Sequence, residues 1–189
     1  MTDALAVRAA ALTLFADRGY RATTMADIGA ALGMRGPSLY RHVRSKQELL
    51  SEIMIETMHT LIADQKAAVE ASDDVVVQLR RLVEAHVRFH ARNREHAFVG
   101  NREIDSLENP ARQLVLDLRR NYERGLRAVI ERGRDADRFD VADPRLASYA
   151  ILDMGIGVAA WFRSDGPRSV EQVAYTYADQ AVRMVAGRG

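Results

Sequence analysis

The chain has 189 residues, of which 48% are hydrophobic and 28% charged, with no cysteine and a formal net charge of +1. This composition is typical of a water-soluble globular protein, and it excludes a disulfide scaffold, a thiolate metal site and a cysteine nucleophile. The charge is unevenly placed, since the first fifty residues hold seven Lys or Arg against four Asp or Glu. A locally basic end indicates a polyanionic partner there.

Neither a signal peptide nor a membrane-spanning helix is expected. The apolar positions near the N-terminus are interrupted by Asp3, Arg8 and Asp17, whereas a signal peptide needs an unbroken apolar segment. The longest apolar run, 149–162, contains Asp153 and falls well short of the roughly 20 residues that cross a bilayer. We therefore expect no membrane partner and a cytoplasmic location, which the lack of cysteine also fits.

Apolar residues recur at three- and four-residue spacing along most of the chain, without sustained alternation, which predicts an all-α protein. Capping residues and prolines mark the helix starts, because their side chains or fixed geometry suit a first helical turn. These signals are Thr24, Ser45 with Glu48, Asn109-Pro110, Asp143-Pro144 and Ser169 with Gln172. They divide the chain into about nine helices, at roughly 3–18, 25–32, 36–42, 45–71, 73–93, 95–106, 110–133, 144–163 and 169–186.

The stretch TTMADIGAALGMRGPSLYRHV, residues 23–43, predicts two short helices joined by a turn. Thr24 can cap the first helix, which Gly33 ends, and Pro37 starts the second. In the second helix Leu39 and Val43 face inward, so its polar side chains face outward. This pattern is that of a helix-turn-helix.

Helices this short need support from neighbours, because nucleation costs more than a few hydrogen bonds return. The first helix offers an apolar stripe of Leu5, Leu12 and Phe15, and the long fourth helix offers Leu49, Leu50 and Ile53. A short supported helix with outward Arg, Ser, Tyr and His side chains suits the dimensions and hydrogen-bonding groups of a DNA major groove.

This segment closely resembles the DNA-binding head of the TetR family of bacterial transcriptional repressors. Two positions depart from the family pattern: Gly29 stands where alanine is usual, and Val43 where phenylalanine is frequent. Gly29 inside a helix should cost about 1 kcal/mol relative to alanine unless a close contact requires it. The residues that carry the resemblance are Thr24, Ile28, Gly33, Met34, Ser38, Leu39, Tyr40, His42, Val43, Ser45, Lys46 and Leu49.

The resemblance implies a helix-turn-helix DNA-binding domain over 1–46 and a helical ligand-binding and dimerisation domain over 47–189. It implies a double-stranded DNA operator of palindromic sequence as partner, with Thr24, Tyr40 and Lys46 at phosphates. It places the base contacts at or beside the recognition helix. The residues nearest the bases are Arg35, Gly36, Ser38 and Arg41, and His42 lies on the same outward face.

In this family the central helices of the second domain enclose a cavity for a small-molecule effector, and the last two helices form a homodimer. The resemblance therefore implies self-association through 144–163 and 169–186. Small residues at Gly155 and Gly157 permit either close helix contact or room for a ligand. The expected effector residues are Phe89, Phe98, Tyr122, Met154 and Trp161, and the expected dimer residues are Val158, Trp161, Val173, Tyr177 and Val182.

The stretch 153–174 is similar to the C-terminal part of a TetR branch that answers to acyl-coenzyme A thioesters. The resemblance implies that such a thioester is the effector. Arginines can then pair with its phosphates, although ordinary surface solvation is the simpler interpretation of each. The candidates are Arg92, Arg94, Arg102 and Arg163.

Other function classes have weaker support in the sequence. His86, His90 and His96 suggest a metal, but two histidines on one helix face are not a complete site, so pocket-lining or packed histidines are favoured. Glu56-x-x-His59 occurs once, whereas a di-iron bundle needs that motif twice. We expect no metal, no cofactor and no enzymatic activity. The alternative is a helical ligand-binding or enzymatic bundle with a vestigial head, which would bind no specific duplex.

Overall fold

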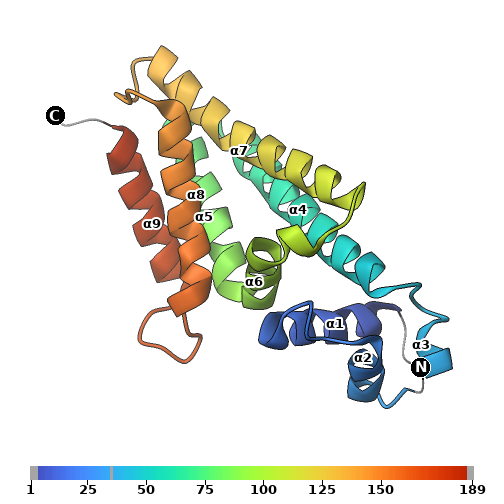
Figure 1. Cartoon of the computed structure of the whole chain (residues 1–189). Helices are drawn as coiled ribbons and strands as arrows, with labels where there is room; N and C mark the ends of the chain where they lie inside the picture. Colours follow the sequence, from blue (N-terminus) through green and yellow to red (C-terminus); the bar gives the residue numbers. More distant parts are fainter. Residues whose placement is uncertain (1–3, 35, 187–189) are drawn as a thin grey trace. The chain divides into compact units, whose positions relative to one another are not determined.

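The computed structural model describes residues 4–34 and 36–186. Within these two ranges the chain forms nine α-helices and one short 3-10 helix, and no strand (Figure 1). The predicted all-α class is therefore confirmed. The helices occupy nearly the ranges expected from the capping residues, so local sequence signals account for most of the element boundaries.

The described residues form two compact units. The head unit comprises those of 1–58 together with 95–117, and the body unit comprises those of 59–94 together with 118–189. Two long helices, α4 (Lys46–Glu70) and α7 (Ala111–Asp135), run from one unit into the other along the chain. The head unit thus includes a segment far from the N-terminus in sequence.

The head unit contains α1 (Ala4–Arg18), α2 (Met25–Ala31), α3 (Gly36–Leu39), α6 (Arg94–Arg102) and the 3-10 helix η1 (Ile104–Ser106), with one end each of α4 and α7. Hydrogen bonds join the N-terminal part of this unit to the chain around η1. Tyr20 donates its backbone N–H to Glu103 at 3.1 Å, and Gln47 donates to the Ser106 carbonyl at 2.7 Å. The segment before α2 and the start of α4 are therefore tied to the chain around η1.

The apolar stripe of α1 differs in one position from the expected one. Leu12 and Phe15 are buried, but Leu5 is 65% exposed, and Val7 and Ala11 take the inward positions. Two of the three predicted stripe residues are therefore buried as expected, and the prediction was wrong for Leu5 alone. The supporting residues of α4, Leu49, Leu50 and Ile53, are buried as expected.

The recognition helix is shorter than predicted. Regular α-helix ends at Leu39, and the chain beyond it closes with hydrogen bonds over three residues, from the N–H of Arg41 to the Ser38 carbonyl and from the N–H of His42 to the Leu39 carbonyl. Such three-residue closures commonly tighten the last turn of a helix whose carbonyls lack further partners. The turn still brings Val43 into the core, 6% exposed.

Gly29 has a packing reason to be small. A Cβ at this position would lie 3.1 Å from the carbonyl oxygen of Met34, which follows the turn. The same turn is closed by the N–H of Met34, which donates to the Gly29 carbonyl at 2.8 Å. The close approach of the turn to the helix therefore offsets part of the helix-propensity cost of glycine.

The body unit contains α5 (Val75–Arg92), α8 (Pro144–Trp161) and α9 (Val170–Val185), with the remaining parts of α4 and α7. Helix α5 packs against both α8 and α9 (Figure 1). Val158 and Val173, expected at a dimer surface, are instead buried inside the unit, at 0% and 3% exposure. They cannot contact another subunit, because α5 and its neighbours already cover them.

Across the described residues, every helix is too short or too polar to cross a membrane.

Candidate nucleic-acid interface and ligand grooves

The turn after α3 presents polar side chains on an apolar anchor. Leu39 is fully buried, whereas Tyr40 is 56% exposed, and Arg41 and His42 are also exposed. Arg41 donates from Nη2 to Ser38 Oγ at 2.9 Å, which links the two predicted base-contacting side chains. The buried Leu39 side chain therefore fixes the backbone of this turn against the core. The hydrogen-bonding groups of the exposed side chains stay accessible to solvent.

Two further residues were predicted to contact bases, Gly36 and Arg35. Gly36 is the first residue of α3. Arg35 lies outside the described residues, so its predicted base contact stays a prediction.

Thr24 caps α2 in a reciprocal capping box with Asp27. The Asp27 N–H donates to Thr24 Oγ1 at 3.1 Å, and the Thr24 N–H donates to the Asp27 carboxylate at 2.8 Å. The Thr24 hydroxyl also donates to that carboxylate at 2.6 Å, and these hydrogen bonds lower the pKa of Asp27. Thr24 is exposed and thus accessible to a phosphate, but its hydroxyl already serves the cap.

Lys46 has a structural role that the sequence interpretation missed. Its Nζ donates to the carbonyl oxygens of Tyr20 and Thr23, at 2.9 and 2.7 Å, and lies 4.2 Å from the centre of the Tyr20 ring. The ammonium group thereby ties the start of α4 to the segment between α1 and α2. It has three donors, so one remains for the predicted phosphate contact.

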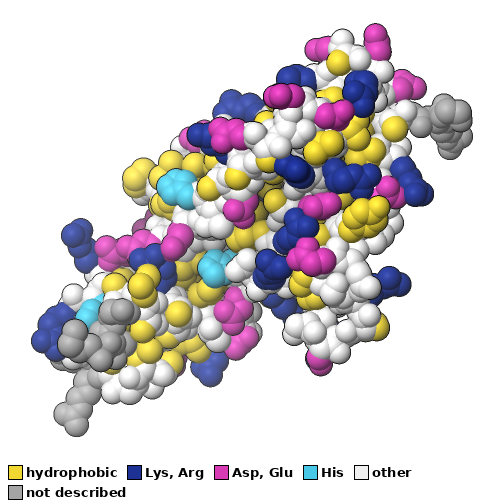
Figure 2. Space-filling view, turned by 180° about the vertical axis from the view of Figure 1, so that it is seen from behind, with side chains coloured by type: hydrophobic (Ala, Val, Ile, Leu, Met, Phe, Trp, Pro, Cys, Tyr) yellow, Lys and Arg dark blue, Asp and Glu magenta, His cyan; other side chains and the backbone are white. Residues whose placement is uncertain are grey.

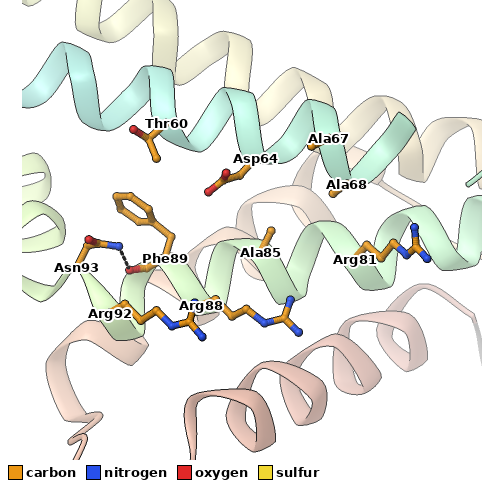
Figure 3. A pocket seen from close by; sticks show the side chains of 10 residues that line it. All are labelled: Thr60, Asp64, Ala67, Ala68, Arg81, Ala85, Arg88, Phe89, Arg92 and Asn93. Atoms are coloured by element: carbon orange, nitrogen blue, oxygen red, sulfur yellow. Dashed lines mark hydrogen bonds between the residues drawn. The ribbon is translucent and has the colours of Figure 1, made fainter. Parts of the chain in front are cut away.

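A groove of about 430 Å³ runs between α4 and α5 in the body unit (Figure 3). Phe89, a predicted effector residue, stands between the two helices, and the small side chains Ala67, Ala68 and Ala85 keep the groove open. Phe89 itself is 7% exposed. Only a small part of its ring therefore faces the groove.

The arginines at the edge of this α4–α5 groove are engaged by other groups of the body unit. Arg88 and Arg92 both pair with Glu171 of α9, at 2.6 and 2.8 Å, and Arg88 also pairs with Glu84 at 3.0 Å. In Figure 3 both side chains point away from α4. On the face drawn in Figure 2, Lys and Arg side chains likewise lie beside Asp and Glu side chains.

A buried polar chain crosses the core of the body unit. His86 Nε2 lies 3.0 Å from the Leu152 carbonyl, which can only accept, so Nε2 donates. His86 Nδ1 consequently accepts from the Tyr122 hydroxyl at 2.9 Å, and His90 Nδ1 donates to the His86 carbonyl at 2.9 Å. Burial, then the charge of His90, lowers the pKa of His86 to about 3, and burial raises the pKa of Tyr122.

These contacts give His86 and His90 a packed, hydrogen-bonded role. The described residues contain no group of three or more His, Cys, Asp or Glu side chains arranged to hold a metal ion. The Tyr122 side chain, predicted to contact effector, is 6% exposed and donates to His86.

The other predicted effector residues lie in separate surroundings. Phe98 is in the head unit, with the Arg102 guanidinium 4.9 Å from its ring centre. Met154 packs on the core of the body unit. Trp161 is 49% exposed, with its ring centre 6.2 Å from that of Phe162 and 6.4 Å from that of Tyr177. Trp161 therefore lies at the surface of the body unit and not in its interior.

A second groove in the body unit, of about 390 Å³, lies between α7 and α8. Five of the seven described residues that line it are arginines. The sequence interpretation did not single out these arginines. The repeated arginines of α7 could have been noticed from their spacing in the sequence. That Arg145 and Tyr149 of α8 line the same groove depends on how the two helices pack. The lining residues are Arg119, Arg120, Glu123, Arg124, Arg127, Arg145 and Tyr149.

Comparison with known families matches both parts of the chain. Residues 7–53 match "Bacterial regulatory proteins, tetR family", and residues 72–185 match "Tetracyclin repressor-like, C-terminal domain". The chain belongs to the TetR family. The DNA-binding transcriptional regulator predicted from the 23–43 stretch is thereby confirmed. Members of this family bind operator DNA and small-molecule effectors.

Curated relatives and solved structures agree with this membership. The chain is 30% identical over 171 residues to the HTH-type transcriptional repressor KstR2 of Rhodococcus jostii, covering 88% of this chain and 83% of that one. The KstR2 repressor of Mycobacterium tuberculosis is 29% identical, at 88% and 84% coverage. These TetR relatives are repressors, and none of these matches supports the enzymatic alternative.

The fold matches over almost the whole length. A tetR-family regulatory protein from Rhodococcus RHA1 superposes with a TM-score of 0.91 at 35% identity, covering 98% of each chain. The TetR regulator PfmR from Thermus thermophilus superposes with a TM-score of 0.86 at 36% identity, covering 96% of this chain and 99% of that one.

Proposed function

We propose that this TetR protein is a homodimeric repressor that binds a palindromic operator and is released by a small-molecule effector. Its two heads enter successive major grooves, whose spacing is roughly 34 Å. The effector favours a body conformation in which the heads no longer match that spacing. For this the effector must bind the released state more tightly, by about 1–3 kcal/mol.

The observation that carries the DNA-binding part is the segment after α3. Tyr40, Arg41 and His42 are exposed, while Leu39 and Val43 hold the same backbone in the core. An arginine can read the two acceptors of guanine, and tyrosine hydroxyls bind phosphate oxygens. Their exposure and side-chain chemistry support base contacts from Ser38 and Arg41. The same considerations support phosphate contacts from Tyr40, Thr24 and Lys46.

Exposed apolar side chains on α8 and α9 support the homodimer. Trp161 and Met184 are exposed, at 49% and 43%, and Tyr177 lies partly buried beside Trp161. A tryptophan half exposed at a helix end is typical of protein interfaces, where it anchors the contact. The predicted dimer ranges 144–163 and 169–186 therefore stay our assignment, with Trp161 and Tyr177 inside the interface.

An acyl-coenzyme A thioester is the proposed effector class. One neighbour of this fold, AibR, was solved with isovaleryl coenzyme A and operator DNA, at 24% identity and a TM-score of 0.83. That identity is too low to transfer a ligand by itself. In this chain, Ala67, Ala68 and Ala85, with the edge of Phe89, give the α4–α5 groove an apolar lining that an acyl group can cover.

Selection of bound duplexes from a random pool tests the proposal. We expect a palindromic consensus, one homodimer per site, and release when a matching acyl-coenzyme A is added. Arg41→Ala serves as the head variant, and Arg168→Ala, exposed between α8 and α9, as the control. Recovery of random sequence, equal to the input pool, would leave only the alternative of a ligand-binding bundle with an unused head.

A further inference from the structure

We propose that Glu103 is a positioning residue for operator binding. It holds the segment between α1 and α2, which leads directly into Thr24, the cap of α2 and a proposed phosphate contact. Glu103 lies in the head unit but outside residues 7–53, which match the bacterial regulatory proteins of the tetR family. The inference rests on the phosphate contacts proposed for Thr24 and Lys46, and it adds a residue that acts through them.

Both carboxylate oxygens of Glu103 accept hydrogen bonds within the head unit. Tyr20 donates its backbone N–H to Oε1 at 3.1 Å, and the Ser106 hydroxyl donates to Oε2 at 2.8 Å. Both contacts are partly buried, and hydrogen bonds to an ionised group are roughly twice as strong as neutral ones. Glu103 therefore joins the segment before α2 to η1, although Tyr20 and Glu103 are 83 residues apart in the sequence.

The chain around η1 is itself fixed, by Gln47 near the start of α4. The Gln47 Nε2 donates to the Ser106 carbonyl at 2.7 Å, and its Oε1 accepts from the Glu108 N–H at 3.3 Å. Leu107, between these two residues, is 4% exposed. This part of the chain is therefore a firm support for the carboxylate of Glu103.

Lys46 holds the same α1–α2 segment through its carbonyl groups. Its Nζ donates to the carbonyls of Tyr20 and Thr23, at 2.9 and 2.7 Å, and the Thr23 side chain is fully buried. Tyr20 is thus bound at its N–H by Glu103 and at its carbonyl by Lys46. The backbone that leads into Thr24 is therefore fixed from two sides.

The two proposed phosphate contacts gain from this support. Groups that must be ordered on binding cost affinity, so groups that are already fixed bind more tightly. Without the Glu103 carboxylate the Tyr20 N–H would lose this partner, and of the two side chains only Lys46 would still hold the segment. The charge of Glu103 alone acts in the opposite direction, because an acid repels phosphates. The sign of the change in DNA affinity therefore separates positioning from simple electrostatics.

Fluorescence anisotropy with the full-length protein tests the inference on the operator selected from the random pool and on a duplex of unrelated sequence. Glu103→Ala should weaken binding to both about tenfold, the order of one lost hydrogen bond to a charged group. The slope of log K against log salt should stay unchanged, because no phosphate contact is removed. Glu103→Gln should restore most of the affinity, because its amide can still accept from Tyr20 and donate to Ser106.

Amide hydrogen exchange supplies a readout that a general loss of stability would not give. Glu103→Ala should speed exchange in 19–24 and 103–108 and leave the helices of the body unit unchanged. Ser106→Ala removes only the hydroxyl that donates to the carboxylate. It should give a smaller change of the same kind, and it keeps the test decisive if Glu103→Ala folds poorly.

Glu108→Ala is the matched control. It removes an exposed acid from the same part of the chain and keeps the backbone N–H that donates to Gln47. It should leave duplex binding unchanged or slightly tighter. Equal or tighter binding by Glu103→Ala would overturn the inference. So would an equal loss in Glu103→Ala and Glu103→Gln, or faster exchange spread uniformly over both units.

Lys46→Met separates this inference from the proposed phosphate contacts. If it leaves the salt slope unchanged while Glu103→Ala still weakens binding, the phosphate contact of Lys46 fails and the positioning role of Glu103 stands. If it lowers the slope while Glu103→Ala binds as tightly as the unmodified protein, the contact stands and the positioning role fails.

Discussion

The imidazole of His86 occupies the space that a side chain at Gly155 would need. A Cβ added at Gly155 would lie 2.6 Å from His86 Nε2 and closer still to its Cδ2. Because that imidazole is held at both nitrogens, by Tyr122 and by the Leu152 carbonyl, it cannot move aside cheaply. Helix α8 therefore approaches α5 closely only because residue 155 lacks a side chain.

Gly155→Ala should lower the free energy of unfolding by about 1–3 kcal/mol, the usual cost of overpacking. The gain in helix propensity, at most about 1 kcal/mol, offsets only part of it. Urea unfolding followed by circular dichroism at fixed protein concentration measures the change. Gly100→Ala, on α6 with nothing within 4 Å of its Cβ, is the control and should be neutral or stabilising.

The same imidazole makes stability depend on pH. Burial lowers the pKa of His86 from 6.5 to about 3 in the folded protein, so the unfolded chain binds a proton that the folded chain excludes. The contribution of the neutral, buried imidazole to the free energy of unfolding is intact above pH 6.5. It is lost progressively as the pH falls from 6.5 toward 3. At pH 5 the loss should be about 2 kcal/mol, and burial of His90 acts in the same direction.

Urea midpoints measured between pH 8 and pH 5 test this prediction. A His86→Gln variant should be less stable at pH 7 but should show a flatter dependence on pH, because the buried imidazole is gone. Equal stability of the unmodified protein at pH 7 and pH 5 would contradict the assignment.

Local signals were sufficient to predict the helices and the head. Capping residues such as Thr24, Asp143 and Ser169 act within four residues of themselves, so their effect can be read without the fold. The residues of the DNA-binding motif around Tyr40 are likewise close together in the sequence, so the motif can be recognised without the fold. The α3 end at Leu39 was missed because it depends on which turn carbonyls find partners.

Properties that depend on packing could not be read from spacing alone. Val158 and Trp161 lie three residues apart on one helix, yet one is buried and the other exposed. Which face α8 buries is decided by α5, and no pattern within α8 specifies it. The α7–α8 groove joins Arg119 to Arg145, which only tertiary packing brings together.

The double role of Lys46 gives a prediction with two readouts. Lys46→Met keeps the aliphatic stem but removes the donors to Tyr20 and Thr23, which should lower stability by about 1–3 kcal/mol. If the remaining donor binds a phosphate, affinity should fall for every duplex and the slope of log K against log salt should decrease by about 1. Unfolding and salt-dependent binding measure the two effects.

Lys66→Gln is the control for this change, because Lys66 is exposed on the body part of α4 and pairs only loosely with Glu70, at 3.7 Å. It should alter neither readout. A stability loss in Lys46→Met without a change in salt slope would show that Lys46 only supports the fold.

Arg41 should contribute to sequence preference. Arg41→Gln removes the guanidinium that lies exposed beside Ser38, and it should weaken binding to the selected operator by about 1–3 kcal/mol while relaxing the preference at one base pair. Binding to a panel of single-base operator variants measures both effects. A uniform loss across the panel would reassign Arg41 to a phosphate.

Two matched aromatic positions can decide which face of α9 meets a second subunit in the proposed homodimer. Tyr177 contacts Trp161 of α8, whereas Tyr175 lies over Arg80 of α5, 5.5 Å from its guanidinium. Residues two apart on a helix point to nearly opposite faces. Only one of these faces can belong to the proposed interface of α8 and α9.

Trp161→Glu should therefore weaken the proposed homodimer by roughly 2 kcal/mol or more, because it places a charge where the proposed interface would bury an aromatic anchor. Tyr175→Glu changes a more exposed ring, 62% against 49% for Trp161, and should leave the homodimer intact. Sedimentation equilibrium over a range of concentrations measures both. The reverse result, with dissociation only in Tyr175→Glu, would move the interface to the α5 side of α9 and remove Trp161 from it.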